Sequence, residues 1–177
     1  MAEINGAEVL VKALAKEGVK KVFGVSGHGV TVLLEALRNE PSIDFISPRH
    51  EENAAHMADG WARATGDVGV CISTVGPGAV NQAAGLAEAY ADSIPVLAVT
   101  ANIQSFISYP AVGSLEDLDT LTYYKPITKW NAVVHDRRRV VTGGLHDAHG
   151  VRGLAARQAE HDGALGGVVH RGLHARH

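Results

Sequence analysis

The chain has 177 residues, of which 46% are hydrophobic, so it can build one domain with a sizeable core. Its net charge of −3 shows none of the basic excess of nucleic-acid-binding surfaces, and no apolar run reaches the roughly 18 residues of a membrane span. The N-terminal residues lack the basic and apolar stretches of a signal peptide. The single cysteine, Cys71, lies in an apolar segment that favours a buried, inert thiol. We therefore expect a cytoplasmic protein with no membrane and no nucleic-acid partner.

Two apolar patterns alternate along the first hundred residues. Segments that are apolar throughout predict buried strands, and segments with apolar residues three or four apart predict amphipathic helices. A first helix ends at Gly18, and the following elements are predicted at 20–25 (strand), 30–37 (helix), 43–47 (strand), 51–64 (helix), 68–73 (strand), 79–90 (helix) and 96–100 (strand). This alternation predicts an α/β fold, a doubly wound and mostly parallel sheet with helices on both faces.

Residues that follow the predicted strands are expected to meet. Ligands of doubly wound folds bind beyond the carboxyl ends of the strands. We therefore expect a cluster at that edge of the sheet, formed by Gly27, Glu51, Gly76 and Ala101. The loop around Gly27 is rich in glycine, but its spacing does not match the G-x-G-x-x-G pattern of dinucleotide-binding proteins, so nicotinamide binding is not predicted.

An acidic residue, Glu51, opens the helix predicted at 51–64. One face of this helix is apolar at helical spacing and should fix the direction of Glu51, through Ala54, Ala55, Ala58, Trp61 and Ala62. The ordinary interpretation of such a carboxylate is a favourable interaction with the helix dipole. A second motif, about 25 residues further on, favours a functional interpretation: a buried strand ends in the turn Gly76-Pro77-Gly78, and a helix of small residues follows.

These motifs, in this order, resemble the pyrimidine-binding domain of thiamine-diphosphate enzymes, in particular the acetolactate synthase-like group. The resemblance is carried by Arg49-His50-Glu51, by the glycine turn within 69–81 and by the segment 92–100, and it runs from about Ile4 to Val134. It implies thiamine diphosphate binding in a decarboxylase or carboligase of small 2-oxo acids. From this resemblance we interpret residues 1–134 as one such domain.

The resemblance also implies roles for individual residues. Glu51 stands where the family has a glutamate that hydrogen-bonds the aminopyrimidine ring, so we interpret it as catalytic and cofactor-binding; this role requires a carboxyl group that can hold or pass a proton. The turn and helix that pack against the ring in the family correspond to Gly76, Pro77, Gly78 and Asn81. Arg49 and His50 are interpreted as structural partners, with a direct role in the active site left open.

The loop after the first strand receives two interpretations. In relatives a loop at this position faces the active site, and the corresponding residues here are Gly27, His28 and Gly29. The alternative is a tight turn with a histidine that faces solvent.

Two features depart from the family. Leu115-Glu116-Asp117 stands where acetolactate synthases carry Phe-Gln-Glu. This difference weakens the assignment to acetolactate synthase in particular and leaves a 2-oxo acid decarboxylase or carboligase in general. The Gly-Asp-Gly motif that holds magnesium and the diphosphate is absent, so no metal ligands are predicted here, and we expect magnesium to be held by a domain outside this chain. Flavin is possible in the parent enzyme but unsupported here, because its usual contacts fall mainly beyond Val134.

Regular patterns weaken after residue 100. The segment 104–124 is interpreted as irregular, with a short helical pattern around Leu115, Leu118 and Leu121, and 125–130 is expected to return to the sheet edge. From residue 135 onward the chain carries seven of its ten histidines, eight of its 20 glycines and no lysine. We interpret 135–177 as an irregular, disordered or frameshifted tail; the alternative is a metal-binding tail that uses the histidine pairs His146 and His149, or His174 and His177.

The organisation of the whole protein stays open between three hypotheses. The chain is a fragment of a longer enzyme, inactive alone; or a small subunit of a two-chain decarboxylase; or a non-catalytic relic that keeps a dimerisation surface. Its partner would be a second copy or a chain with the diphosphate-binding domain. All three predict an exposed apolar patch on the helices that start at Glu51 and Ala79, because the family pairs these domains across subunits.

Overall fold

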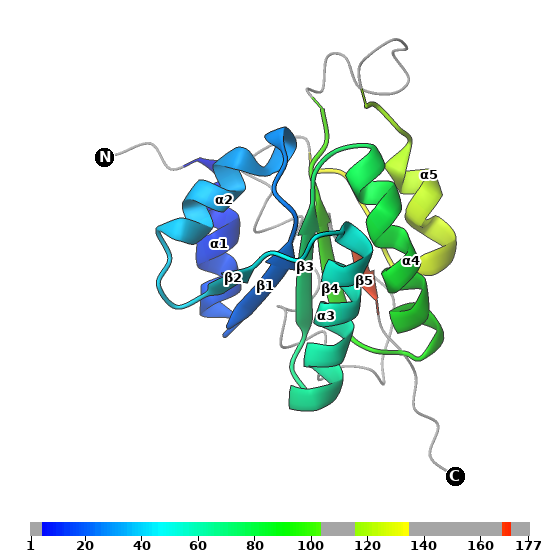
Figure 1. Cartoon of the computed structure of the whole chain (residues 1–177), viewed down its shortest axis with the longest axis horizontal. Coiled ribbons are helices and arrows are strands. Elements are labelled where there is room, and N and C mark those ends of the chain that lie inside the picture. The colour runs from blue at the N-terminus through cyan, green and yellow to red at the C-terminus, as the bar shows by residue number, and fades with distance from the viewer. Residues whose placement is uncertain (1–4, 104–115, 135–167, 171–177) are drawn as a thin grey trace.

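The computed structural model describes residues 5–103, 116–134 and, as backbone, 168–170 (Figure 1). The helices and strands are α1 (Gly6–Lys16), β1 (Lys21–Gly24), η1 (His28–Val30), α2 (Thr31–Arg38), β2 (Asp44–Ile46), α3 (Glu51–Thr65), β3 (Gly69–Ser73), α4 (Pro77–Ala91), β4 (Val96–Thr100), α5 (Thr120–Tyr124), η2 (Lys125–Ile127) and β5 (Val168–His170). Every strand and helix predicted up to residue 100 is present. None of the described helices is long and apolar enough to cross a bilayer.

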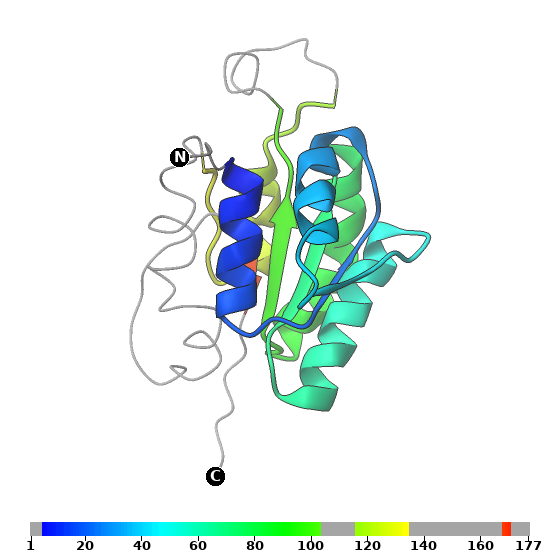
Figure 2. The same cartoon turned by 90° about the vertical axis from the view of Figure 1, so that its left-hand side faces the viewer.

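The strands form one sheet in the order β2-β1-β3-β4-β5. The first four strands are parallel, and helices cover both faces, α1 and α2 on one side and α3 and α4 on the other (Figures 1 and 2). The prediction of a doubly wound α/β fold is confirmed.

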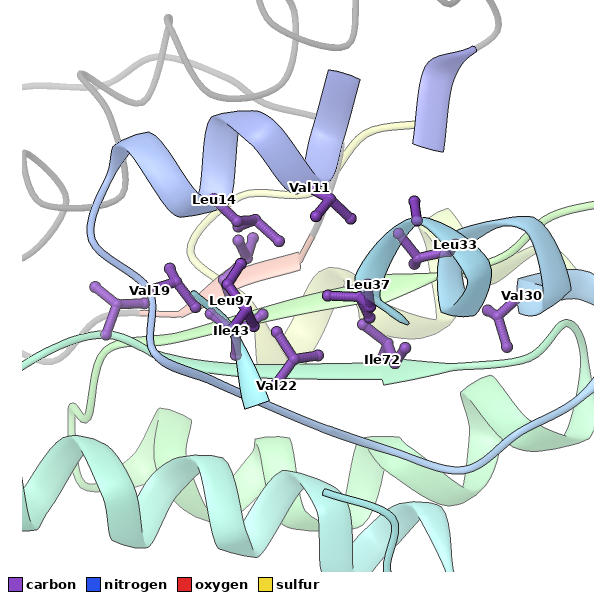
Figure 3. Close-up of a cluster of buried hydrophobic side chains, with 13 residues drawn as sticks. Val11, Leu14, Val19, Val22, Val30, Leu33, Leu37, Ile43, Ile72 and Leu97 are labelled. Carbon is purple, nitrogen blue, oxygen red and sulfur yellow. The ribbon is translucent and has the colours of Figure 1, made fainter. Parts of the chain in front are cut away.

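Two cores, one on each face, hold the helices to the sheet. The core under α1 and α2 consists mainly of branched aliphatic side chains, and Figure 3 shows Leu14 and Leu37 directed from these helices toward the strands. The core under α3 and α4 is rich in alanine and includes the buried thiol of Cys71. Burial raises the pKa of this thiol, which agrees with an inert structural cysteine.

Small residues let α3 and α4 pack closely. A Cβ atom added at Gly85 in α4 would lie 2.7 Å from Ala55 Cβ and 2.9 Å from the carbonyl oxygen of Glu52 in α3. The spacing of the two helices is therefore set where α3 begins, next to Glu51.

The later part of the chain differs from its predictions. The predicted helical pattern around Leu118 and Leu121 is confirmed only from Thr120 onward, and Leu115 lies outside the described residues. The segment 125–130 forms η2 and a single bridge residue, Trp130, and it belongs to none of the five strands. Pro126 is one physical reason, because proline lacks the N–H that a strand needs.

One correction concerns the predicted irregular tail. Residues 168–170 form β5, which pairs antiparallel with β4 through Leu97 and Val169. Two valines and a histidine are too short a pattern to predict a strand, even though valine favours strands. The rest of the tail, with His146, His149, His174 and His177, lies outside the described residues, so the boundary at 134 stays a prediction.

The predicted apolar patch also stays a prediction. Large apolar side chains with at least a third of their surface exposed include Met57 on α3 and Tyr90 on α4, but also Val32 on α2 and Tyr123 on α5. Their distribution over several helices does not single out α3 and α4.

Candidate functional site

The loops that leave β1, β3 and β4 meet at the carboxyl edge of the sheet. A Cβ at Gly29 would lie 2.8 Å from both Ala101 Cβ and Val75 Cγ1, and the Ala101 amide donates to the carbonyl of Ser73. A Cβ at Gly27 would lie 2.5 Å from Thr74 Cβ. The sheet therefore brings together the loop residues that the sequence analysis placed at this edge.

Glu51 occupies the first position of α3 and is half-buried. Residue His50 precedes it in an extended conformation and caps the helix with its side chain. Asn81 in α4 donates from Nδ2 to Glu51 Oε2 over 3.1 Å. This hydrogen bond joins two residues that the resemblance assigned to the same ring-binding site.

The turn Gly76-Pro77-Gly78 lies between Glu116 and the carboxyl group of Glu51. Gly76 has a φ of +54°, and a Cβ there would lie 2.2 Å from the carbonyl oxygen of Glu116, so both the backbone and the space require glycine. A Cβ at Gly78 would lie 2.7 Å from Thr74 Cγ2 and 3.3 Å from Glu51 Oε1. Pro77 opens α4, a position where proline's missing N–H costs nothing.

Thr74 is a residue that the sequence analysis missed. Its Oγ1 accepts a hydrogen bond from the Gly29 amide at 3.3 Å, and its side chain also packs against Gly27 and Gly78. Thr74 thereby connects the loop of β1 to the turn beside Glu51. A polar residue directly after a buried strand and before a glycine turn was the available signal.

His28 and Glu116 form a second pair at this edge. His28 Nε2 lies 3.6 Å from Glu116 Oε2, which makes an ion pair when the imidazole is protonated. The His28 side chain is 70% exposed, so the structure supports both its solvent contact and its place beside the turn. Glu116 was noticed in the sequence only as a departure from the family, and its contact with Gly76 spans 40 residues, which no local pattern reveals.

A buried polar group supports the first turn of α4. The Tyr124 hydroxyl donates to the carbonyl of Ala79 at 2.6 Å, and both this hydroxyl and Ser73 Oγ lie 3.3 Å from Gln82 Oε1. Burial raises the pKa of Tyr124, which keeps its hydroxyl a donor.

Gln82 Nε2 has no partner among the described residues. Among the described residues, no group of three His, Cys, Asp or Glu side chains is arranged to hold a metal ion.

Comparison with known proteins identifies the family of this chain. The family model "Thiamine pyrophosphate enzyme, N-terminal TPP binding domain" matches residues 4–121. A probable acetolactate synthase large subunit of Methanocaldococcus jannaschii is 44% identical over 130 residues, which are 72% of this chain and 21% of that protein. The large subunit of acetolactate synthase isozyme 3 of Escherichia coli is 42% identical over 135 residues, 76% of this chain and 23% of that protein.

A longer match, with the acetolactate synthase of Arthrospira platensis, is 38% identical over 149 residues, or 81% of this chain and 25% of that protein. The chain thus spans between 21% and 25% of the length of these three relatives. The family expected from the motifs is confirmed: the chain belongs to the thiamine pyrophosphate enzymes and corresponds to their N-terminal TPP binding domain, in the form found in acetolactate synthase-like proteins.

Proposed function

We propose that this chain binds the aminopyrimidine half of thiamine diphosphate for a 2-oxo acid decarboxylase or carboligase of the acetolactate synthase-like group. The observation that carries the proposal is the Glu51–Asn81 hydrogen bond of 3.1 Å beside Gly78. The family match alone would leave the position of the site in this chain open.

The residues at the turn fit an aminopyrimidine ring. Gly78 lets the turn approach the carboxyl group of Glu51 closely, because a Cβ there would lie 2.7 Å from Thr74 Cγ2 and 3.3 Å from Glu51 Oε1. Asn81 engages Oε2 of Glu51, and among the described residues no hydrogen bond engages Oε1. A ring nitrogen of the aminopyrimidine would hydrogen-bond this Oε1 atom, which lies beside the backbone of Gly78.

Each residue has a distinct task in this proposal. Glu51 would hold or pass a proton at Oε1 with a ring nitrogen, and the start of α3 stabilises its negative charge. Asn81 would orient the carboxyl group, Thr74 would connect the loop of Gly27, His28 and Gly29 to the turn beside Glu51, and Pro77 with its two glycines would shape that turn. When bound, thiamine diphosphate supplies the electron-storing chemistry of 2-oxo acid reactions.

We propose that a second domain completes the site, because relatives are four to five times longer than the matched region. That domain would hold the diphosphate and magnesium, either in a longer product or on a partner chain or second copy. Residues 1–134 would form the pyrimidine-binding domain. A flavin in the parent enzyme would make its contacts outside this domain.

Ligand-observed NMR with the 177-residue chain tests the proposal. Saturation of protein signals should transfer to the pyrimidine protons of thiamine diphosphate more strongly than to its thiazole protons. Glu51→Ala should weaken binding about tenfold, the worth of one hydrogen bond to a charged group. Glu51→Gln should bind but leave the assembled enzyme inactive, because an amide cannot pass the proton.

Glu88→Ala is the matched control, because Glu88 is an exposed carboxylate on α4 paired with His56 rather than with Asn81. It should leave the transfer unchanged. Equal transfer to both rings, or a signal that Glu51→Ala does not reduce, would contradict the proposal.

A further inference from the structure

The residue before Glu51 caps α3 with an imidazole ring. His50 has φ −151° and ψ 145°, the extended conformation of an N-cap residue, and its Nδ1 accepts a hydrogen bond from the Glu52 amide at 3.3 Å. An imidazole nitrogen accepts only when it carries no proton, so the cap requires neutral His50 with its hydrogen on Nε2. Serine, threonine, asparagine and aspartate, the usual N-cap residues, do not lose this acceptor near neutral pH.

The charged groups around His50 would have opposing effects on its protonated ring. Glu52 Oε2 lies 3.9 Å from Nδ1 and would attract a protonated ring, and Glu51 and Arg49 flank it in the chain. From the facing helix α4, Glu88 contacts His56, and His56 also contacts Glu52.

The cap outweighs the ion pair. Losing a helix cap changes the equilibrium of the first turn by roughly fivefold. The exposed pair between His50 and Glu52 contributes roughly twofold, because both side chains are nearly half exposed to water. A cation at the start of a helix is also opposed by the helix dipole. Protonation should therefore loosen the first turn of α3.

We propose that His50 is a positioning residue for Glu51 and works only as the neutral imidazole. Glu51 lies between the cap and the amide that the cap holds, so its backbone direction depends on the hydrogen bond from Glu52 to His50. The hydrogen bond from Asn81 to Glu51 depends on that direction, so a change in the Asn81 side-chain signals would detect a change in it. The consequence for catalysis rests on the proposed function of Glu51, whereas the capping equilibrium does not.

A pH titration of the ¹⁵N-labelled chain, followed by NMR from pH 8 to 5.5, tests the proposal. Histidines gain their second proton within this range. In the wild type, exchange of the Glu52 amide with water, corrected for the pH dependence of the chemistry, should accelerate roughly fivefold on acidification. The Asn81 side-chain NH₂ signals should shift with the same midpoint.

Three variants assign the effect. His50→Asn keeps a cap that does not titrate, so Glu52 should stay protected and Asn81 unshifted across the range. His50→Ala should show fast exchange at every pH. His56→Gln removes the other histidine near Glu52 and should leave the wild-type response in place.

Two outcomes would overturn the proposal. A Glu52 amide that exchanges independently of pH in the wild type would exclude the titrating cap. An Asn81 shift that persists in His50→Asn would assign the change to Glu51 itself and exclude a positioning role, even if His50→Ala failed to fold. Neither measurement involves thiamine diphosphate, so failure here is distinct from failure of the proposed function.

Discussion

The two faces of the sheet are packed with different kinds of side chain. The core on the α1 and α2 side consists mainly of valine, leucine and isoleucine, as Figure 3 shows, whereas the core on the α3 and α4 side consists mainly of alanine. Large side chains contribute more burial energy, and small ones let helices approach closely. We infer that the first face supplies most of the stability and that the second places Glu51 against Asn81.

The largest expected effect comes from the aliphatic face. Leu14→Ala empties a site where the side chain is 1% exposed, and we expect a loss of about 3 kcal/mol in the free energy of unfolding. Urea denaturation measures it as a lower midpoint at an unchanged slope. The exposed Val32→Ala on α2 should change almost nothing, and a similar loss in both variants would mean that this face does not dominate stability.

A smaller but functional effect is expected on the alanine face. Gly85→Ala adds a Cβ that meets Ala55 and the Glu52 backbone, so we expect a loss of about 1–2 kcal/mol despite the better helix propensity of alanine. It should also displace the Asn81 side-chain signals in NMR spectra, which Leu14→Ala should leave in place if the protein stays folded.

Gly60→Ala is the matched control for that substitution. Gly60 also lies within a helix, α3, but a Cβ there would meet nothing within 4 Å. We expect it to stabilise the chain by about 0.5–1 kcal/mol, as alanine does in an exposed helix. If Gly85→Ala were also stabilising, close packing of α3 on α4 would not be what requires glycine.

Loss of the buried hydroxyl that supports the first turn of α4 should reduce the free energy of unfolding by about the contribution of one hydrogen bond. Tyr124→Phe keeps the ring but removes the donor to the Ala79 carbonyl, and we expect a loss of about 1 kcal/mol by thermal or urea unfolding. Tyr123 is 46% exposed, so Tyr123→Phe should be neutral. Equal effects from the two variants would argue against a specific role for the buried hydroxyl.

The smallest effect is a titration on the surface of the aliphatic face. Hydrogen bonds from Arg38 and Asn39 lower the pKa of Glu35 from 4.5 to about 2. Because the folded pKa lies below the unfolded one, the stabilisation is present above pH 4.5 and is lost as the pH falls toward 2. Carboxyl NMR should show the low midpoint in the wild type and a return toward 4.5 in Arg38→Ala; an unchanged midpoint would rule out the guanidinium as its cause.

The amino-acid pattern by itself determined the elements up to residue 100 and the position of Glu51 at the start of a helix. Apolar periodicity indicates which side of a single element is buried, and Gly76-Pro77-Gly78 indicates a local turn. Neither prediction depends on residues that are distant in the sequence. The same patterns placed the loops at the carboxyl edge, because a parallel sheet carries all such loops on one side.

Only the tertiary structure decided which side chains meet there. The Gly29–Thr74 and Asn81–Glu51 hydrogen bonds and the contact of Tyr124 with Ala79 join residues 45, 30 and 45 positions apart. The contact of Gly76 with Glu116 spans 40 positions, and the pairing of Leu97 in β4 with Val169 in β5 spans 72. Such contacts depend on how helices pack against the sheet, and many sequences share the same local pattern without sharing that packing.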